Sequence, residues 1–139
     1  MRMKPSLTAA DTRQILAAAI AAAEKSQWAV SIAVGDDGGA LLALQRLDGA
    51  FPQSAEIATR KAWTAAAARR PTKVLEDVVK ERPAAVGFPG QLRVQGGLPI
   101  LVGGDCVGAV GVSGVQSHQD EQVAQAAIDA FLTSAPPPT

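Results

Sequence analysis

The chain has 139 residues, a length typical of one domain, and its 47% hydrophobic and 19% charged residues exclude intrinsic disorder as its overall state. Thirteen basic and thirteen acidic side chains cancel to a formal net charge of +0, so we expect no nucleic-acid partner. A single cysteine excludes an internal disulfide framework, a single histidine excludes a multi-histidine metal site, and no stretch has the roughly 20 apolar residues that cross a bilayer.

The first half of the chain alternates alanine-rich helices with one hairpin. The spacing of apolar residues predicts a helix over residues 8–26 and another over 53–69. Between them, two alternating segments over 28–47 flank an Asp-Gly-Gly turn, which is typical of a β-hairpin. Basic residues before the apolar run 15–23 faintly resemble a secretory signal. Because that run is mostly alanine, we favour a cytoplasmic protein whose first element is a helix.

The second half predicts a short amphipathic helix over 72–81 and an irregular segment, rich in proline and glycine, over 82–97. A second hairpin over 99–113 follows, and then a helix that Ser117 caps and that runs to about Leu132. Hairpins placed between helices favour an α+β fold with an antiparallel sheet. We expect one domain over 1–133 and a flexible, proline-rich tail over 134–139.

Five short motifs occur in an order that matches one family. They are residues 46–50 (RLDGA), 57–65 (IATRKAWTA), 96–100 (GGLPI), 107–114 (VGAVGVSG) and 119–121 (QDE). Together they resemble the GlcG/HbpS-like family of small haem-binding or haem-degrading proteins, which also forms the C-terminal domain of PduO-type cobalamin adenosyltransferases. The resemblance covers roughly residues 7–132.

The resemblance implies a profilin-like fold with three layers, α/β/α, in which helices flank a five-stranded antiparallel sheet. It also implies a homo-oligomer, haem as the cofactor if there is one, and a small anionic ligand as the partner. Trp63, inside the second motif, would cover a pocket or fill an interface.

Lys61 and Thr64 are the first candidate site residues, because they face the same way on the second helix. A lysine among alanines is either partly desolvated, and then useful as a base, an anion clamp or an axial ligand, or it keeps its head in water. His118 is the second candidate for acid–base work. It lies in the first turn of the last helix, where the helix dipole favours a neutral imidazole that can bind iron.

Arg46 and Asp48, at the end of a strand, either clamp a carboxylate or fix the loop for each other. Glu56 and Arg60, four residues apart, are most simply a surface ion pair. The remaining candidates for ligand contact are small residues whose backbone a ligand could approach, or which serve turns and tight packing instead. They are Gly96, Gly97, Ser113 and Gly114.

The candidate metal ligands are His118, Asp120 and Glu121, although the two acidic groups are also explained by the helix dipole. Three functions follow from these residues. The first is a haem-binding protein in which Lys61 and Arg46 hold the carboxylates of the ligand. The second is an enzyme that acts on an organic acid, with Lys61 or His118 as the acid–base group. The third is a non-catalytic module that assembles into an oligomer.

Overall fold

A computed structural model describes residues 1–134 of the chain. The helices are α1 (Ala9–Lys25), α2 (Ser54–Ala68), α3 (Thr72–Glu81) and α4 (Ser117–Ser134), with a 3-10 turn, η1, at Pro83–Val86. The strands are β1 (Ser31–Asp36), β2 (Leu41–Arg46), β3 (Gly97–Val102) and β4 (Asp105–Ser113). Each predicted helix and each predicted hairpin is present, with ends that differ by a few residues.

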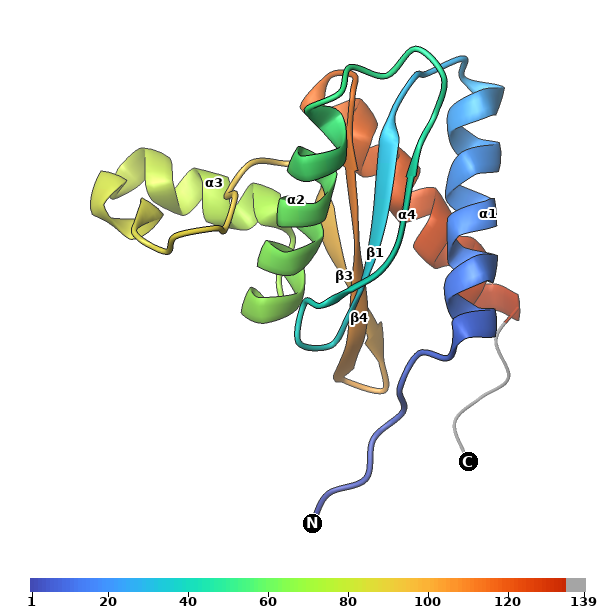
Figure 1. Ribbon diagram of the computed structural model, residues 1–139. Coiled ribbons are helices and arrows are strands. Elements are labelled where there is room, and N and C mark those ends of the chain that lie inside the picture. Colours follow the sequence, from blue (N-terminus) through green and yellow to red (C-terminus); the bar gives the residue numbers. More distant parts are fainter. Residues whose placement is uncertain (135–139) are drawn as a thin grey trace.

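The strands form one antiparallel sheet in the order β2-β1-β4-β3, with helices on both of its faces (Figure 1). The α+β prediction is therefore confirmed, but the expected five-stranded sheet is wrong, because residues 1–134 contain four strands. The segment that precedes β3 forms the turn η1 and irregular loops, and its prolines and glycines explain why it adds no further strand.

The two faces of the sheet carry different side chains. On the face covered by α1 and α4, branched residues such as Ile32, Val34 and Val110 pack against Ile15 and other apolar helical residues. On the opposite face, small residues of the strands meet a row of alanines on α2. Because successive residues of a strand point to opposite faces, one strand supplies both kinds of surface.

The close approach of α2 depends on Gly111 in the central strand β4. A Cβ atom added to Gly111 would lie 2.1 Å from the carbonyl oxygen of Ala58 and 2.5 Å from the backbone nitrogen of Ala62. Only glycine therefore allows the backbone of α2 to pack directly on the sheet at this position.

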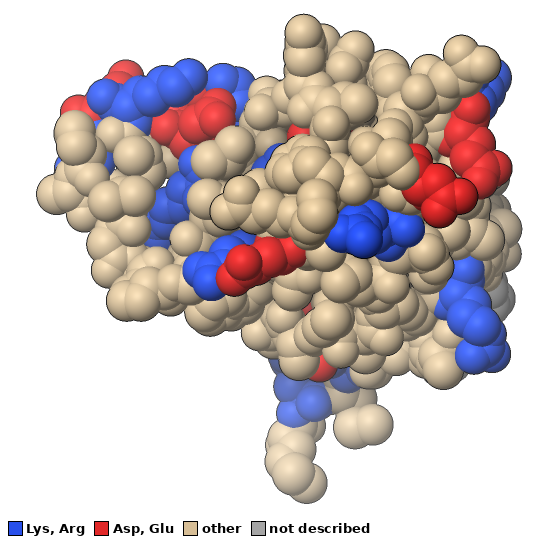
Figure 2. Space-filling view, turned by 45° about the horizontal axis from the view of Figure 1, so that its top comes forward, with Lys and Arg blue, Asp and Glu red and all other residues tan. Residues whose placement is uncertain are grey.

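The helix α3 and the turn η1 form an arm that projects from the sheet (Figure 1). In the space-filling view, positive and negative groups are interleaved along this arm, on the left of Figure 2.

Two of the sequence expectations need correction near the C-terminus. Ser117 is the first residue of α4 and does not precede it, and Ser134 is the last residue of α4. The rest of the expected tail, 135–139, lies outside the described residues. Within the described part, no helix is long and apolar enough to span a membrane.

Candidate functional site

Lys61 lies at the centre of a buried polar cluster that joins three elements. Its side chain leaves α2, and its ammonium group donates hydrogen bonds to the carbonyl oxygen of Val112 at 3.0 Å and to Asp120 Oδ2 at 3.3 Å. The second carboxylate oxygen, Asp120 Oδ1, accepts a hydrogen bond of 3.1 Å from the backbone N–H of Val115. Lys61 and Asp120 are each 2% exposed. Of the two interpretations of Lys61, the one with its head in water is wrong.

Burial shifts the proton affinity of both members of this pair. Removal of water lowers the pKa of Lys61 below its ordinary value, and the Asp120 carboxylate offsets part of that effect. Burial raises the pKa of Asp120, which Lys61 and the N–H of Val115 partly oppose. The two shifts have one cause, because each charge leaves water and its partner replaces only part of the lost solvation.

The candidate glycines Gly96 and Gly97 lie against Lys61, and protein atoms already occupy the space where their side chains would be. A Cβ atom on Gly96, where φ is +133°, would lie 2.6 Å from Lys61 Nζ, and one on Gly97 would lie 2.5 Å from the Lys61 carbonyl oxygen. Thr64, one turn further along α2, is fully buried and accepts a hydrogen bond of 2.8 Å from the N–H of Leu92. The structure thus brings Lys61, Thr64, Gly96 and Gly97 into one packed region. Their contacts there are with other residues of the protein.

Arg46 and Asp48 lie elsewhere, in a hollow of about 420 Å³ beside Trp28 at the C-terminal end of α1. Among the described residues Arg46 forms no ion pair, so the expected contact with Asp48 that would fix the loop is not made. Arg46 is exposed and pairs with Ser31 in the sheet, and Ser31 in turn pairs with the buried Ser113. Arg46 is therefore exposed and without an anionic side-chain partner among residues 1–134.

The remaining candidates are spread over the start of α4. Gly114 packs against Ala29, His118 is exposed, and Glu121 accepts a hydrogen bond of 3.3 Å from Gln95 Nε2. Within residues 1–134, no three His, Cys, Asp or Glu side chains come together as a metal site. Asp120 is engaged with Lys61, so the expected trio of His118, Asp120 and Glu121 does not form a metal-binding cluster.

Another hollow is a groove between α2 and the edge strand β2, which we call the α2–β2 groove. Its volume is about 410 Å³. Its lining residues are Leu44, Ala55, Glu56, Thr59, Arg60, Trp63 and Gly90. The ion pair that the four-residue spacing predicted is present on its rim, where Arg60 Nη2 and Glu56 Oε1 are 2.7 Å apart.

Trp63 forms one end of the α2–β2 groove and is 36% exposed. A Cβ atom on Gly39, in the β1–β2 turn, would lie 2.3 Å from Trp63 Cδ1, and one on Gly90 would lie 2.4 Å from Cζ3. The indole is therefore clamped between two backbone segments and presents a fixed aromatic surface. Trp63 is among the residues predicted from the sequence, whereas Leu44, Ala55 and Thr59 are not, because they carry no signal of their own beyond an alanine-rich helix and an apolar strand.

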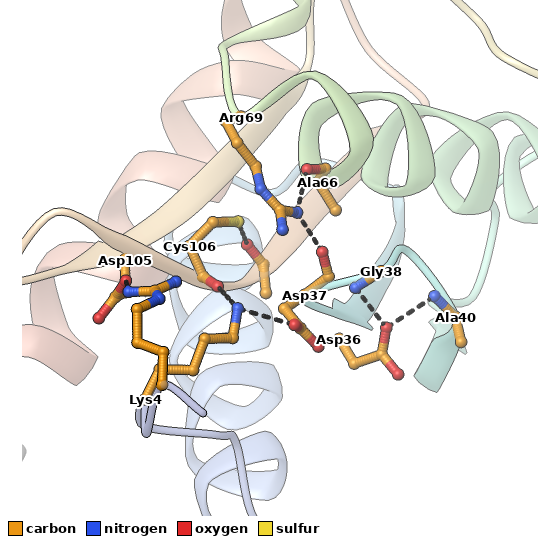
Figure 3. Close-up of polar contacts among 11 residues, drawn as sticks. Lys4, Asp36, Asp37, Gly38, Ala40, Ala66, Arg69, Asp105 and Cys106 are labelled. Carbon is orange, nitrogen blue, oxygen red and sulfur yellow. Dashed lines mark hydrogen bonds and ion pairs between the residues drawn. The ribbon is translucent and has the colours of Figure 1, made fainter.

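The end of the sheet that carries the β1–β2 turn and the start of β4 is closed by polar contacts of the N-terminal segment (Figure 3). Lys4 Nζ donates a hydrogen bond to the Cys106 carbonyl oxygen at 3.0 Å and lies 2.8 Å from Asp37 Oδ2, so it bridges the two hairpins. Asp36 Oδ1 accepts hydrogen bonds from the N–H groups of Gly38 and Ala40 and fixes the β1–β2 turn. These contacts tie the N-terminal segment to both hairpins at this end of the sheet.

Comparison with known proteins gives a consistent result. Residues 7–129 match the family model described as haem degrading protein HbpS-like. The chain is 48% identical over 114 residues to protein GlcG of Escherichia coli K12, which covers 81% of this chain and 85% of that protein.

Solved structures agree with the sequence matches. The crystal structure of a double mutant of Streptomyces reticuli HbpS superposes with a TM-score of 0.87 and 38% identity, covering 93% of this chain and 89% of that chain. The crystal structure of a PduOC:Heme complex superposes with a TM-score of 0.83 and 30% identity, covering 91% of this chain and 95% of that chain.

Proposed function

The chain belongs to the HbpS-like family, and from that membership we propose that it binds haem in the α2–β2 groove. The observation that carries the proposal is the lining of this groove, where apolar side chains lie beside a cation. A relative crystallised with haem supports the same ligand class.

The residues of the groove fit the chemistry of haem. Leu44, Ala55 and Trp63 offer apolar and aromatic surface to a flat macrocycle, and small-ligand sites combine such a lining with a few polar groups. Arg60 supplies a guanidinium on the rim for one carboxylate, in exchange for its contact with Glu56. Arg46 lines the separate hollow beside Trp28, so it stays a proposed carboxylate partner for a ligand bound there.

Bound haem would supply a redox-active iron, and the chain would supply the apolar surface and the carboxylate partners. No His, Cys or Met is among the residues that line the groove, so its own donors to iron are the oxygens of Thr59 and Glu56. His118 is an exposed imidazole on α4, which covers the other face of the sheet from α2, so it stays a proposed iron ligand only for a group bound away from this groove. Lys61 is assigned a structural role instead, because its ammonium group is buried and already bonded.

The alternative of an acid–base enzyme that uses Lys61 loses support for the same reason. A substrate would have to displace both the Val112 carbonyl and the Asp120 carboxylate to reach Lys61 Nζ. We infer that any reaction on this protein takes place on a ligand bound at the surface grooves.

The test is a titration of purified protein with haemin, followed by absorbance, for wild type and the variants Arg60→Ala and Trp63→Ala. We expect a Soret shift that saturates at a defined ratio, with binding weakened roughly tenfold in Arg60→Ala, since a hydrogen bond to a charged group contributes roughly 1.5 kcal/mol. The control is Arg13→Ala, an exposed arginine on α1 in the opposite layer, which should bind like wild type. A shallow, non-saturating change that is equal in all four proteins would exclude haem as the ligand of this groove.

A further inference from the structure

The two edges of the sheet differ in how they are protected. The edge strand β3 contains Pro99, which cannot donate a backbone hydrogen bond and so discourages another strand from pairing there. The edge strand β2 has no proline, and its first charged residue is Arg46 at its last position. In the described part of the chain, no segment other than β1 pairs with β2.

The side chains of β2 are also unusually apolar for an exposed strand. Leu41, Leu42 and Leu44 are 49%, 42% and 39% exposed. A long, apolar and unprotected edge strand is a template for pairing with another chain, and native proteins cover or charge such edges. Within residues 1–134, the one charged residue of β2 is Arg46 at its last position, and β1 is the one strand paired with it.

We infer that β2 is the surface through which two copies of this chain join, and that β2 of the second copy forms the open wall of the α2–β2 groove. The identity of the ligand in the groove rests on the proposed function, whereas the pairing of the two copies rests on the exposed edge of β2 alone.

A second copy is the partner that the chemistry of β2 fits. Two identical strands related by a two-fold axis pair antiparallel, and residues 41–45 (LLALQ) can then lie beside themselves without a like-charge contact. In the same arrangement, Arg46 of the partner subunit lies toward the β1–β2 turn, which carries Asp36 and Asp37. Asp37 is already paired with Lys4, whereas the carboxylate of Asp36 has no cationic partner among the described residues. The cation at one end of β2 therefore meets the Asp36 carboxylate of the other copy.

The pairing also produces a trough of suitable width. The helix α2 lies mainly over β4 and β1. In the paired sheet, the axis of α2 and the axis of the same helix in the second copy are therefore four strand spacings apart, which is about 19 Å at the usual strand separation. Two helices of about 10 Å diameter then leave a gap of about 9 Å, floored by the leucines of both β2 strands. A flat ligand held in this gap would contact Leu44 and Trp63 of one copy and the β2 strand of the other.

Disulfide trapping tests the pairing directly. In a Cys106→Ser background, which removes the native thiol, the variants Leu42→Cys, Ala43→Cys and Leu44→Cys place one cysteine at successive positions of β2. Near the two-fold axis, opposed Cα atoms come within the 4.4–6.8 Å that a disulfide needs, so at least one variant should oxidise to a covalent dimer. The control is Leu101→Cys on the other edge strand, which is 46% exposed and should remain monomeric on a denaturing gel. No dimer from any β2 position, or equal dimer from Leu101→Cys, would overturn the inference.

A charge in the middle of the strand gives a second, independent readout. Leu42→Lys brings two lysines together across the axis, so we expect its mass in solution to fall to that of a smaller species, whereas Leu101→Lys leaves the mass unchanged. If Leu42→Lys dissociates and its haemin affinity falls as well, the second wall of the groove is confirmed. If it dissociates but binds haemin as tightly as wild type, the shared wall is wrong and the haem proposal stands. If cysteine trapping succeeds but no variant binds haemin, the pairing stands and the haem proposal fails.

Discussion

At the scale of single residues, the most informative feature is the pair of Lys61 and Asp120. Two charges are buried, 3.3 Å apart, and each is also bonded to a backbone group. Such pairs add little net stability, because desolvation offsets the attraction, but removal of one partner leaves a buried charge without compensation. The pair joins α2, in one layer, to α4, in the other, at the end of the sheet.

We therefore expect Lys61→Met to lower the free energy of unfolding by about 3–5 kcal/mol, because Asp120 loses its cationic partner. The double variant Lys61→Met/Asp120→Asn should recover much of this loss, since the amide still accepts the hydrogen bond of Val115 and carries no charge. Urea denaturation of the two variants and the wild type measures both effects. A double variant as unstable as Lys61→Met would show that packing, and not charge, is what Lys61 supplies.

The raised pKa of Asp120 also predicts a dependence on pH. A group whose folded-state pKa lies above its ordinary value of 3.8 binds more protons when folded, so its contribution to stability is complete below pH 3.8 and is lost as the pH rises through the folded-state pKa. Asp120→Asn has no such group. The difference in unfolding free energy, wild type minus variant, should therefore fall as the pH rises above 3.8. A difference that grows over this range would mean that Lys61 lowers the pKa of Asp120 more than burial raises it.

At the scale of elements, the packing of α2 on the sheet controls the site. The helix approaches closely because its buried face is alanine and because Gly111 lies beneath it. Its opposite edge then supplies Ala55, Thr59 and Trp63 to the groove. A change that lifts α2 from the sheet must therefore alter the groove as well as the core.

Gly111→Ala tests this coupling. The added Cβ would meet backbone atoms of α2, which cannot rotate away, so we expect a loss of about 1–3 kcal/mol in unfolding free energy. Haemin affinity should fall in the same variant. The matched control is Gly38→Ala, where the nearest atom to an added Cβ is Asp36 Oδ1 at 3.6 Å and where stability should change little. A Gly111→Ala protein of normal stability would show that α2 has room to move.

At the scale of the whole molecule, one end of the sheet and one of its edge strands differ in whether their groups have partners. The end with the hairpin turns is tied by Lys4 and Asp36, whereas β2 leaves an apolar edge open. A molecule with one such edge gains stability when the edge is covered, because association removes apolar surface from water.

Stability should therefore depend on protein concentration. If two copies join through β2, the midpoint of chemical denaturation should rise as the wild-type concentration is raised, because association stabilises only the folded chain. Leu42→Lys should remove this dependence, and Leu101→Lys should keep it. A midpoint independent of concentration for wild type would mean that the edge stays uncovered in solution.

The amino-acid sequence by itself determined the elements, the α+β class and the family. These follow from signals that residues close together in the sequence produce. Such signals are the alanine spacing of α1 and α2, the turn glycines of the two hairpins and the ordered motifs. The sequence also predicted the contact between Glu56 and Arg60, because four residues form one helical turn.

Only the tertiary structure decided the roles of the charged and small residues. Lys61 and Asp120 are 59 positions apart, and nothing in their local sequence shows that they meet. For a similar reason, Lys61 and Arg46, which were expected to hold one ligand together, lie apart. Lys61 belongs to a buried ion pair, and Arg46 is an exposed cation in another hollow. Whether a charge faces water or another charge depends on the packing of distant elements, and sequence spacing carries no record of that.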